Sequence, residues 1–318
     1  MEPVRSTAPS TGTGEEGIRI EGVTHVYRGG TRALDGVDLE IGRGLFGLLG
    51  PNGAGKSTLM RIICTLLIPT AGTVQVNGYD VVRQRRRVRA LLGYLPQEFG
   101  AWRLHRVEEV LDTLARLSGQ VDHARRRQRV GEVLAAVGLD EVADRKVKKL
   151  SGGMVRRLGV AQALVHEPEV LVVDEPTVGL DPEERIKFRQ LMAELATQRV
   201  IVLSTHIVAD LGPACRDLAL LDEGKIVYRG DPAALRRRAK GRVFELAGEP
   251  GREPTVGESS EEVSRSTRDG RVVVRAVSAS TSLPAGALAV EEPTLEEAYL
   301  AFMLERGRVE LAMDEGET

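Results

Sequence analysis

The chain has 318 residues, of which 42% are hydrophobic and 28% charged, as in a soluble globular protein with one large and one smaller domain. A net charge of -2 gives no bulk attraction to nucleic acid, and we expect no nucleic-acid partner. Two cysteines, Cys64 and Cys215, are too few for a disulfide framework or a zinc site and suit a reducing cytosol. No apolar run approaches the roughly eighteen residues of a membrane span, so a role in a membrane would need another chain.

The N-terminal part predicts strands after a polar tail. Residues 1–17 are rich in Ser, Thr, Gly, Pro and Glu without a hydrophobic signal core, and we expect a disordered tail. Residues 18–23 and 37–41 alternate in the manner of strands around a glycine turn. Residues 73–76, followed by an Asn-Gly pair, predict a further short strand and a hairpin.

A phosphate-binding loop is predicted between the apolar run 45–49 and the helical pattern 59–63. Its G-x-x-x-x-G-K-[ST] pattern is formed by Gly50, Pro51, Asn52, Gly53, Ala54, Gly55, Lys56, Ser57 and Thr58. Glycines let backbone N–H groups turn toward phosphate oxygens, and the helix N-terminus adds a positive dipole. Lys56 would reach the β- and γ-phosphates, and the Ser57 hydroxyl would ligate Mg²⁺. The structural alternative is a glycine-rich turn with a capping Ser.

Helical periodicity dominates the middle of the chain. Residues 83–92 predict a basic helix and 93–96 a buried strand end, after which Gln97 offers an amide oxygen to a metal or water. From 107 to about 163 the pattern predicts an all-helical insertion. Ser151, Gly152 and Gly153 would form a helix N-cap with exposed donors, hence a second anion-binding nest or a plain cap. A solvent-facing side chain is the alternative for Gln97.

Polar residues follow two of three predicted parallel strands, at 170–173, 200–203 and 218–221. Asp174 and Glu175 follow the first strand, where Asp174 would lie near Mg²⁺ and Glu175 near an attacking water. His206 follows the second and could donate a hydrogen bond to a γ-phosphate. The alternatives are an acidic turn and a structural histidine.

The composition changes after about residue 240. Residues 243–246 and 271–277 predict strands, 249–269 a loop or linker, and Thr294 opens a last helix with a capping box. We expect a main domain at 18–240 with a helical subdomain at about 100–163, an accessory domain at 241–308, and a disordered tail at 309–318.

The order of these motifs resembles that of an ATP-binding-cassette (ABC) ATPase over residues 18–231. Residues 50–58 resemble a Walker A motif, 150–154 the ABC signature, and 171–175 a Walker B motif with its catalytic Glu175. Gln97 resembles a Q-loop, 178–181 a D-loop ending in Asp181, and His206 an H-switch. Tyr27 stands where the family places an aromatic ring that stacks on adenine, although a strand-edge tyrosine is the alternative. Met154 departs from the family's glutamine.

The resemblance implies an α/β P-loop fold with a mostly parallel core sheet, an N-terminal antiparallel β subdomain, a helical signature subdomain and a small C-terminal α+β appendage. It also implies that two cassettes, as a homodimer or a pair of homologues, enclose two ATP molecules with Mg²⁺. Ser151, Gly152 and Gly153 would contact a γ-phosphate held by the other chain, and Asp181 would communicate across the interface. Catalysis would involve Glu175, His206 and Gln97, and the metal would bind Ser57, Gln97 and Asp174.

Three segments resemble the drug- and antibiotic-export, daunorubicin-resistance-like branch of this family: 154–158, 96–100 and 292–299. The segment 101–105 does not. The branch implies a cytoplasmic ATPase subunit, peripheral on the cytoplasmic face of the membrane through a separate integral-membrane permease. The alternatives are a soluble ABC ATPase acting on ribosomes or nucleic acid, and a regulatory cassette.

Overall fold

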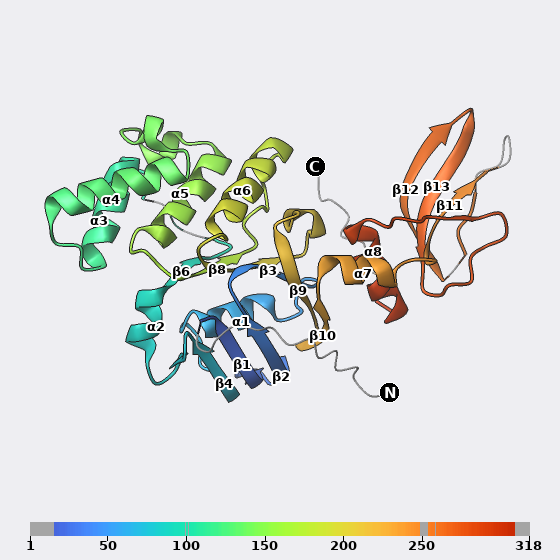
Figure 1. Ribbon diagram of the computed structural model, residues 1–318, viewed down its shortest axis with the longest axis horizontal. Helices are drawn as coiled ribbons and strands as arrows, with labels where there is room; N and C mark the ends of the chain where they lie inside the picture. The colour runs from blue at the N-terminus through green and yellow to red at the C-terminus, as the bar shows by residue number, and fades with distance from the viewer. Residues whose placement is uncertain (1–15, 99, 101, 249–253, 258, 309–318) are drawn as a thin grey trace.

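The computed structural model describes residues 16–98, 100, 102–248, 254–257 and 259–308, and this part of the chain contains three β-sheets (Figure 1). The tails predicted at 1–17 and 309–318 fall almost wholly outside the described residues. None of the helices in the described part has both the length and the apolar character needed to cross a bilayer.

The central sheet has six strands in the order β10-β9-β3-β8-β7-β6. Strands β6, β7, β8, β3 and β9 run parallel, and only the edge strand β10 is antiparallel to its neighbour. This confirms the parallel core expected from the apolar runs. The strands are β3 (Gly44–Leu49), β6 (Leu92–Leu95), β7 (Val170–Asp174), β8 (Val200–Thr205), β9 (Cys215–Asp222) and β10 (Lys225–Gly230).

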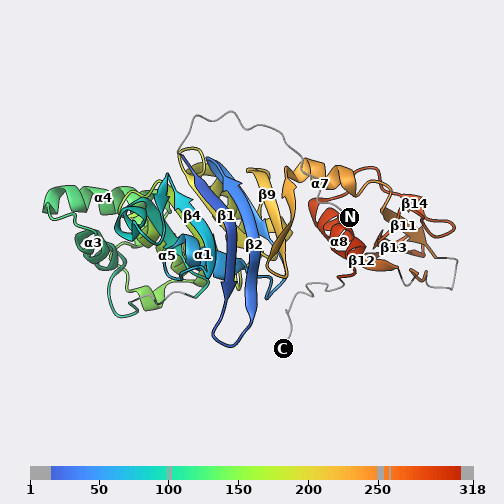
Figure 2. The same cartoon turned by 90° about the horizontal axis from the view of Figure 1, so that it is seen from below.

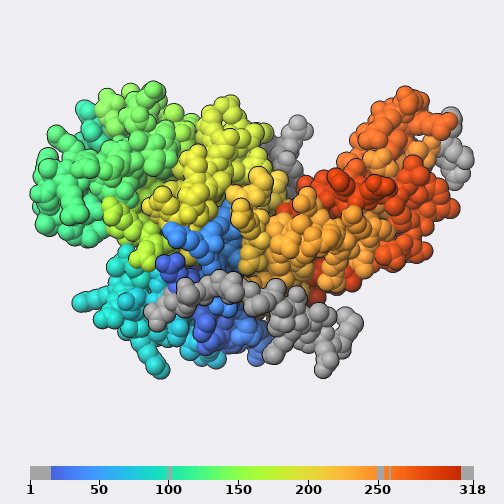
Figure 3. Space-filling view, in the orientation of Figure 1, coloured from blue at the N-terminus to red at the C-terminus, as the bar shows by residue number. Residues whose placement is uncertain are grey.

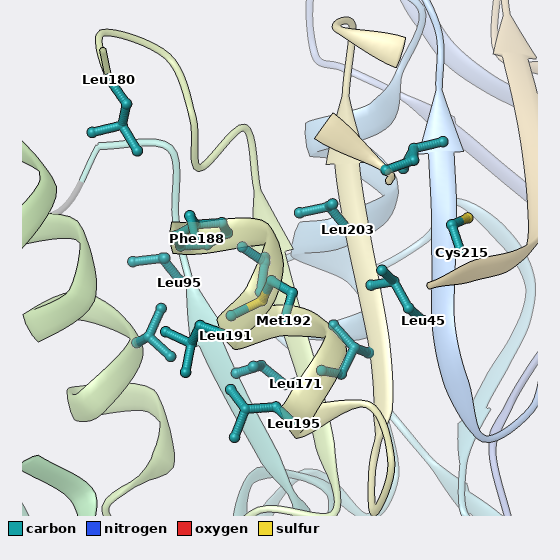
Figure 4. Close-up of a cluster of buried hydrophobic side chains, with 14 of the residues drawn as sticks. Leu45, Leu95, Leu171, Leu180, Phe188, Leu191, Met192, Leu195, Leu203 and Cys215 are labelled. Atoms are coloured by element: carbon teal, nitrogen blue, oxygen red, sulfur yellow. The ribbon is translucent and has the colours of Figure 1, made fainter. Parts of the chain in front are cut away.

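The two faces of the central sheet carry two separate hydrophobic cores, because alternate side chains of a strand point to opposite faces. Leu171 and Val173 belong to the first core, together with helices α3, α5 and α6, and Figure 4 shows part of it around Phe188. Val170 and Val172 belong to the second core, together with helix α1. The helices that contribute to the first core are α3 (Val107–Leu117), α4 (His123–Ala136), α5 (Gly152–Leu164) and α6 (Pro182–Leu195). Three short 3-10 turns lie between or after them: η1 (Asp140–Val142), η2 (Val147–Lys149) and η3 (Val208–Asp210). Helix α1 (Lys56–Ile63) is therefore separated from α5 by the sheet.

An antiparallel sheet covers the second core, with strand order β2-β1-β4-β5 (Figure 2). Its inward residues, such as Ile20 and Leu39, pack in the same cluster as α1. The predicted N-terminal strands and hairpin are thus present. The elements are β1 (Ile18–Val26), β2 (Arg32–Ile41), β4 (Ala71–Val76), β5 (Tyr79–Asp80) and the basic helix α2 (Arg85–Leu91).

The C-terminal part forms a lobe beside the central sheet (Figure 3). Its sheet has the order β12-β13-β11-β14, and α8 packs against α7, η3 and β13. The elements are α7 (Pro232–Arg238), β11 (Val243–Ala247), β12 (Ser260–Arg268), β13 (Arg271–Ser278), β14 (Leu288–Ala289) and α8 (Leu295–Glu305). The capping box at Thr294 is confirmed, since its side chain accepts from the N–H of Glu297 and the Glu297 carboxylate accepts from its N–H.

The loop predicted over 249–269 is wrong for residues 260–268, which form β12. This strand lies at the edge of its sheet, and none of its side chains is fully buried. It therefore shows no apolar alternation, and its pairing with β13 is what makes it a strand.

Candidate nucleotide-binding site

The predicted phosphate-binding loop joins the end of β3 to helix α1, which begins at Lys56. Gly53 and Gly55 have φ angles of 79° and 106°, in the left-handed region that favours glycine. The Lys56 ammonium donates to the carbonyl oxygens of Gly50 at 2.6 Å and Pro51 at 3.1 Å. The loop thus has a curved backbone, with its lysine folded inside it.

The remaining loop residues differ in how far they are buried. Ala54 is buried, Asn52 is exposed, and Ser57 is half-buried in the first turn of α1. Thr58 is buried, and its hydroxyl is hydrogen-bonded to that of Tyr27 at 3.0 Å. Tyr27 is 38% exposed, and its ring meets that of His25 edge to face, with centroids 4.7 Å apart.

Glu175 connects the loop to His206. Its Oε1 atom lies 3.1 Å from the Lys56 Nζ, and the Nδ1–H of His206 donates to its Oε2 at 2.7 Å. Burial alone would raise the pKa of Glu175, but the hydrogen bond from His206 and the charge of Lys56 outweigh it and hold this pKa below its ordinary value. The carboxylate is therefore ionised and able to accept a proton.

Asp174 ends strand β7 and is 2% exposed. The hydroxyl of Ser204, on the neighbouring strand β8, donates to its Oδ1. The Asp174 carboxylate and the Ser57 hydroxyl are hard oxygen donors. Mg²⁺ is usually bound by one or two such protein ligands together with nucleotide phosphates and water. In the described part of the chain no group of three or more His, Cys, Asp or Glu side chains could hold a metal by itself. The residues present fit Mg²⁺.

Gln97 is exposed in the loop after β6, and its backbone oxygen accepts a hydrogen bond from Arg156 of α5 at 2.6 Å. It borders a pocket of about 810 Å³ that Gly152 and Gly179 also line. The structure therefore brings the predicted Q-loop, signature and D-loop around one hollow.

Ser151 and Asp181 both act as helix N-caps. The Ser151 hydroxyl accepts from the N–H of Met154 at 3.2 Å, and Asp181 accepts from the N–H of Glu184 at 2.8 Å. Ser151 and Gly152 are exposed, whereas Gly153 is buried. The predicted cap at Ser151 is confirmed, and its role toward phosphate stays a prediction.

Asp210 is a site residue that the sequence did not reveal. It is 3% exposed, and its Oδ2 accepts hydrogen bonds from the hydroxyls of Thr177 and Thr205. Burial raises its pKa, although the two hydroxyls oppose that shift. Asp210 thus joins the segment after Glu175 to the end of strand β8, which precedes His206. No local pattern predicts the contact with Thr177, because this threonine comes from another segment of the chain.

These features define an α/β P-loop protein with a nucleotide site at the C-terminal ends of its parallel strands. The ABC transporter family profile matches residues 34–178. The daunorubicin/doxorubicin resistance ATP-binding protein DrrA of Streptomyces peucetius is 38% identical over 231 residues, 72% of this chain and 69% of that protein. The Nod factor export ATP-binding protein I of Paraburkholderia xenovorans is 38% identical over 223 residues, 70% of this chain and 73% of that protein. The chain therefore belongs to the ABC transporter family of ATP-binding proteins, as predicted.

Further relatives agree on the fold. The probable multidrug ABC transporter ATP-binding protein YbhF of Escherichia coli is 41% identical over 198 residues, but the chain spans only 34% of its length. The structure of cbiO1 from Clostridium perfringens, part of the ABC transporter complex cbiONQ, has a TM-score of 0.63 at 27% identity, covering 69% of this chain and 89% of that one. A dimeric post-hydrolysis structure of the cassette MJ0796, bound to ADP and Pi, has a TM-score of 0.61 at 27% identity, covering 67% and 98%. The predicted ABC cassette fold is confirmed.

Proposed function

We propose that this chain is the ATP-hydrolysing subunit of an ABC exporter and drives a separate integral-membrane permease. The observation that carries the proposal is the buried Glu175, held ionised between Lys56 and His206. An anionic carboxylate at this point is suited to orient a water molecule and take its proton.

In this proposal each residue of the site has its own role in ATP binding or hydrolysis. Lys56 leaves Glu175 and binds the β- and γ-phosphates, while backbone N–H groups of the loop hold the phosphate oxygens. The released Glu175 orients the attacking water and accepts its proton, and His206 donates a hydrogen bond to the γ-phosphate. Tyr27 stacks on the adenine ring. When bound, Mg²⁺ held by Ser57, Asp174 and Gln97 would neutralise charge on the phosphates.

The site needs a second cassette to be complete. Helix α5, which begins after Ser151, packs on one face of the central sheet, and helix α1, which follows the phosphate loop, packs on the other. In a head-to-tail dimer, Ser151, Gly152 and Gly153 of one copy cover the γ-phosphate bound by the other, and Asp181 lies at the contact. Support comes from the similar cassette MJ0796, whose structure is dimeric.

The export role rests on relatives whose names refer to drug resistance, multidrug transport and Nod factor export. We place the subunit on the cytoplasmic face of the membrane, held there by its permease. The Glu175–His206 contact favours a hydrolysing subunit over a regulatory cassette.

Two measurements test the proposal. Purified protein should release phosphate from ATP. The rate of release should rise more steeply than linearly with protein concentration, because only the dimer hydrolyses ATP and the fraction of dimer grows with concentration. Phosphate release that is absent from the protein alone and from its complex with a co-purified membrane protein would refute hydrolysis. Hydrolysis without any membrane partner in pull-downs from its own cells would refute the export role only.

A further inference from the structure

The carboxylate of Glu184 packs directly against the first turn of the signature helix α5. A Cβ atom built on Gly153 would lie 2.0 Å from the Oε2 of Glu184 and 2.4 Å from its Cδ. Such distances are far below van der Waals contact, so only glycine fits at position 153 while Glu184 keeps this position. The Glu184 side chain is 16% exposed and thus lies mostly inside the contact between α6 and α5.

Arg157 forms an ion pair with the same carboxylate. Its Nη2 lies 3.7 Å from the Oε2 of Glu184, and its side chain is also 16% exposed. Its Nη1 donates to the backbone oxygen of Gly138, just after α4, at 3.1 Å. Arg157 therefore ties α5 both to α6, through Glu184, and to the end of α4.

The backbone of Glu184 is bound to the predicted D-loop. Its N–H donates to the Asp181 carboxylate at 2.8 Å, and this contact caps α6. One residue thus contacts the D-loop through its main chain and the signature helix through its side chain. A carboxylate close to the first turn of a helix is also stabilised by the helix dipole.

We propose that Glu184 is a positioning residue that holds the start of α5 against α6. In that position, the donors of Ser151 and Gly152 point outward, toward the γ-phosphate bound by the second cassette. The role rests on the proposed function, because it matters only if the signature covers nucleotide in a dimer.

The first test compares Glu184→Gln with Glu183→Gln in a Glu175→Gln background, where hydrolysis does not disperse the dimer. Glu183 is the matched control, since its side chain is 78% exposed on the same helix turn. Sedimentation would measure the ATP concentration at half-maximal dimerisation, and nucleotide binding to the monomer would be measured in parallel. We expect Glu184→Gln to raise that ATP concentration by about tenfold and leave monomer binding unchanged, a coupling in the range found for residues in contact.

The outcomes separate the two proposals. If the Glu175→Gln parent does not dimerise with ATP, the composite site is wrong and the role of Glu184 is wrong with it. If the parent dimerises and Glu184→Gln requires the same ATP concentration as Glu183→Gln, only the positioning role is refuted.

A second test uses the close contact between Gly153 and the Glu184 carboxylate. It compares the effect of one substitution in two backgrounds, so its result does not rest on the stability of a single variant. Gly153→Ala should weaken ATP-driven dimerisation strongly when Glu184 is present, because the new Cβ displaces the carboxylate. Combined with Glu184→Ala, the same substitution should cost about threefold or less, since the clash is gone. Equal costs in both backgrounds would refute the contact as the cause. Thermal unfolding of each variant would separate misfolding from misplacement of α5.

Discussion

Replacing Glu175 with glutamine should tighten ATP binding while it stops hydrolysis. The Lys56 ammonium lies 3.1 Å from the Glu175 carboxylate, and each side chain is 5% exposed. Lys56 must leave this carboxylate to reach the phosphates, so the ion pair opposes nucleotide binding. Glutamine keeps the size of the side chain and removes its charge.

The size of the effect follows from this geometry. Two opposite charges at that separation attract each other by about 5 kcal/mol at an effective dielectric constant of about 20. Desolvation offsets much of this attraction, and a hydrogen bond to a charged group retains about 1.5–3 kcal/mol. Since 1.4 kcal/mol is about a tenfold change, we expect ATP to bind at least about tenfold more tightly to Glu175→Gln.

Hydrolysis should fall by about 10²–10⁴-fold, the usual loss when a general base is removed. Nucleotide titration would measure affinity, a phosphate-release assay would measure turnover, and Glu194→Gln, an exposed glutamate of α6, is the control. Unchanged or weaker ATP affinity would refute the competition for Lys56. Normal turnover would refute the assignment of Glu175 as the base.

Three further substitutions test other parts of the structure. Lys56→Ala should weaken ATP binding by about 10–100-fold, as expected for the loss of charged hydrogen bonds, and unchanged affinity would contradict the phosphate-loop assignment. Tyr27→Ala should weaken ATP binding by about 1–3 kcal/mol through lost stacking while Tyr27→Phe, which loses only the bond to Thr58, should not; equal losses in titration would contradict stacking. Burial would raise the pKa of Glu297, but the Arg275 guanidinium outweighs it and holds this pKa below its ordinary value, so its stabilisation is present at neutral pH and is lost as the pH falls through the lowered pKa. Glu297→Gln should therefore lower the unfolding midpoint at pH 7 and flatten the decline of this midpoint in acid, and parallel pH profiles would contradict this.

Local patterns were enough to predict most of the cassette. The apolar run at 170–173 is typical of a parallel strand buried on both faces, and the polar pair after it is then expected at the edge of the sheet. The phosphate loop and the cap at Thr294 were predictable for a similar reason, because their hydrogen bonds join residues close in sequence.

Contacts between distant segments could not be predicted in this way. The Lys56–Glu175 pair joins residues 119 positions apart, from 175 − 56, and no residue pattern shows that the lysine turns inward to meet it. The bond from Thr177 to Asp210 likewise joins two segments that lie apart in the sequence. Strand β12 was missed because its stability comes from pairing with β13 rather than from an apolar face.

The division of the core into two clusters gives the dimer proposal its physical basis. Leu171 and Val173 pack with the helices around α5, while Val170 and Val172 pack with α1, so the central sheet separates the signature helix from the phosphate-loop helix. In the proposed dimer, the donors of the signature contact a γ-phosphate that is bound by the other cassette. It follows that a single substitution at Ser151 should impair the nucleotide site of the second chain, and mixing Ser151→Ala with Lys56→Ala protein should leave one intact composite site in each mixed dimer. Phosphate release by the mixture, with neither variant active alone, is the expected result, and an inactive mixture that still forms mixed dimers would contradict the composite site.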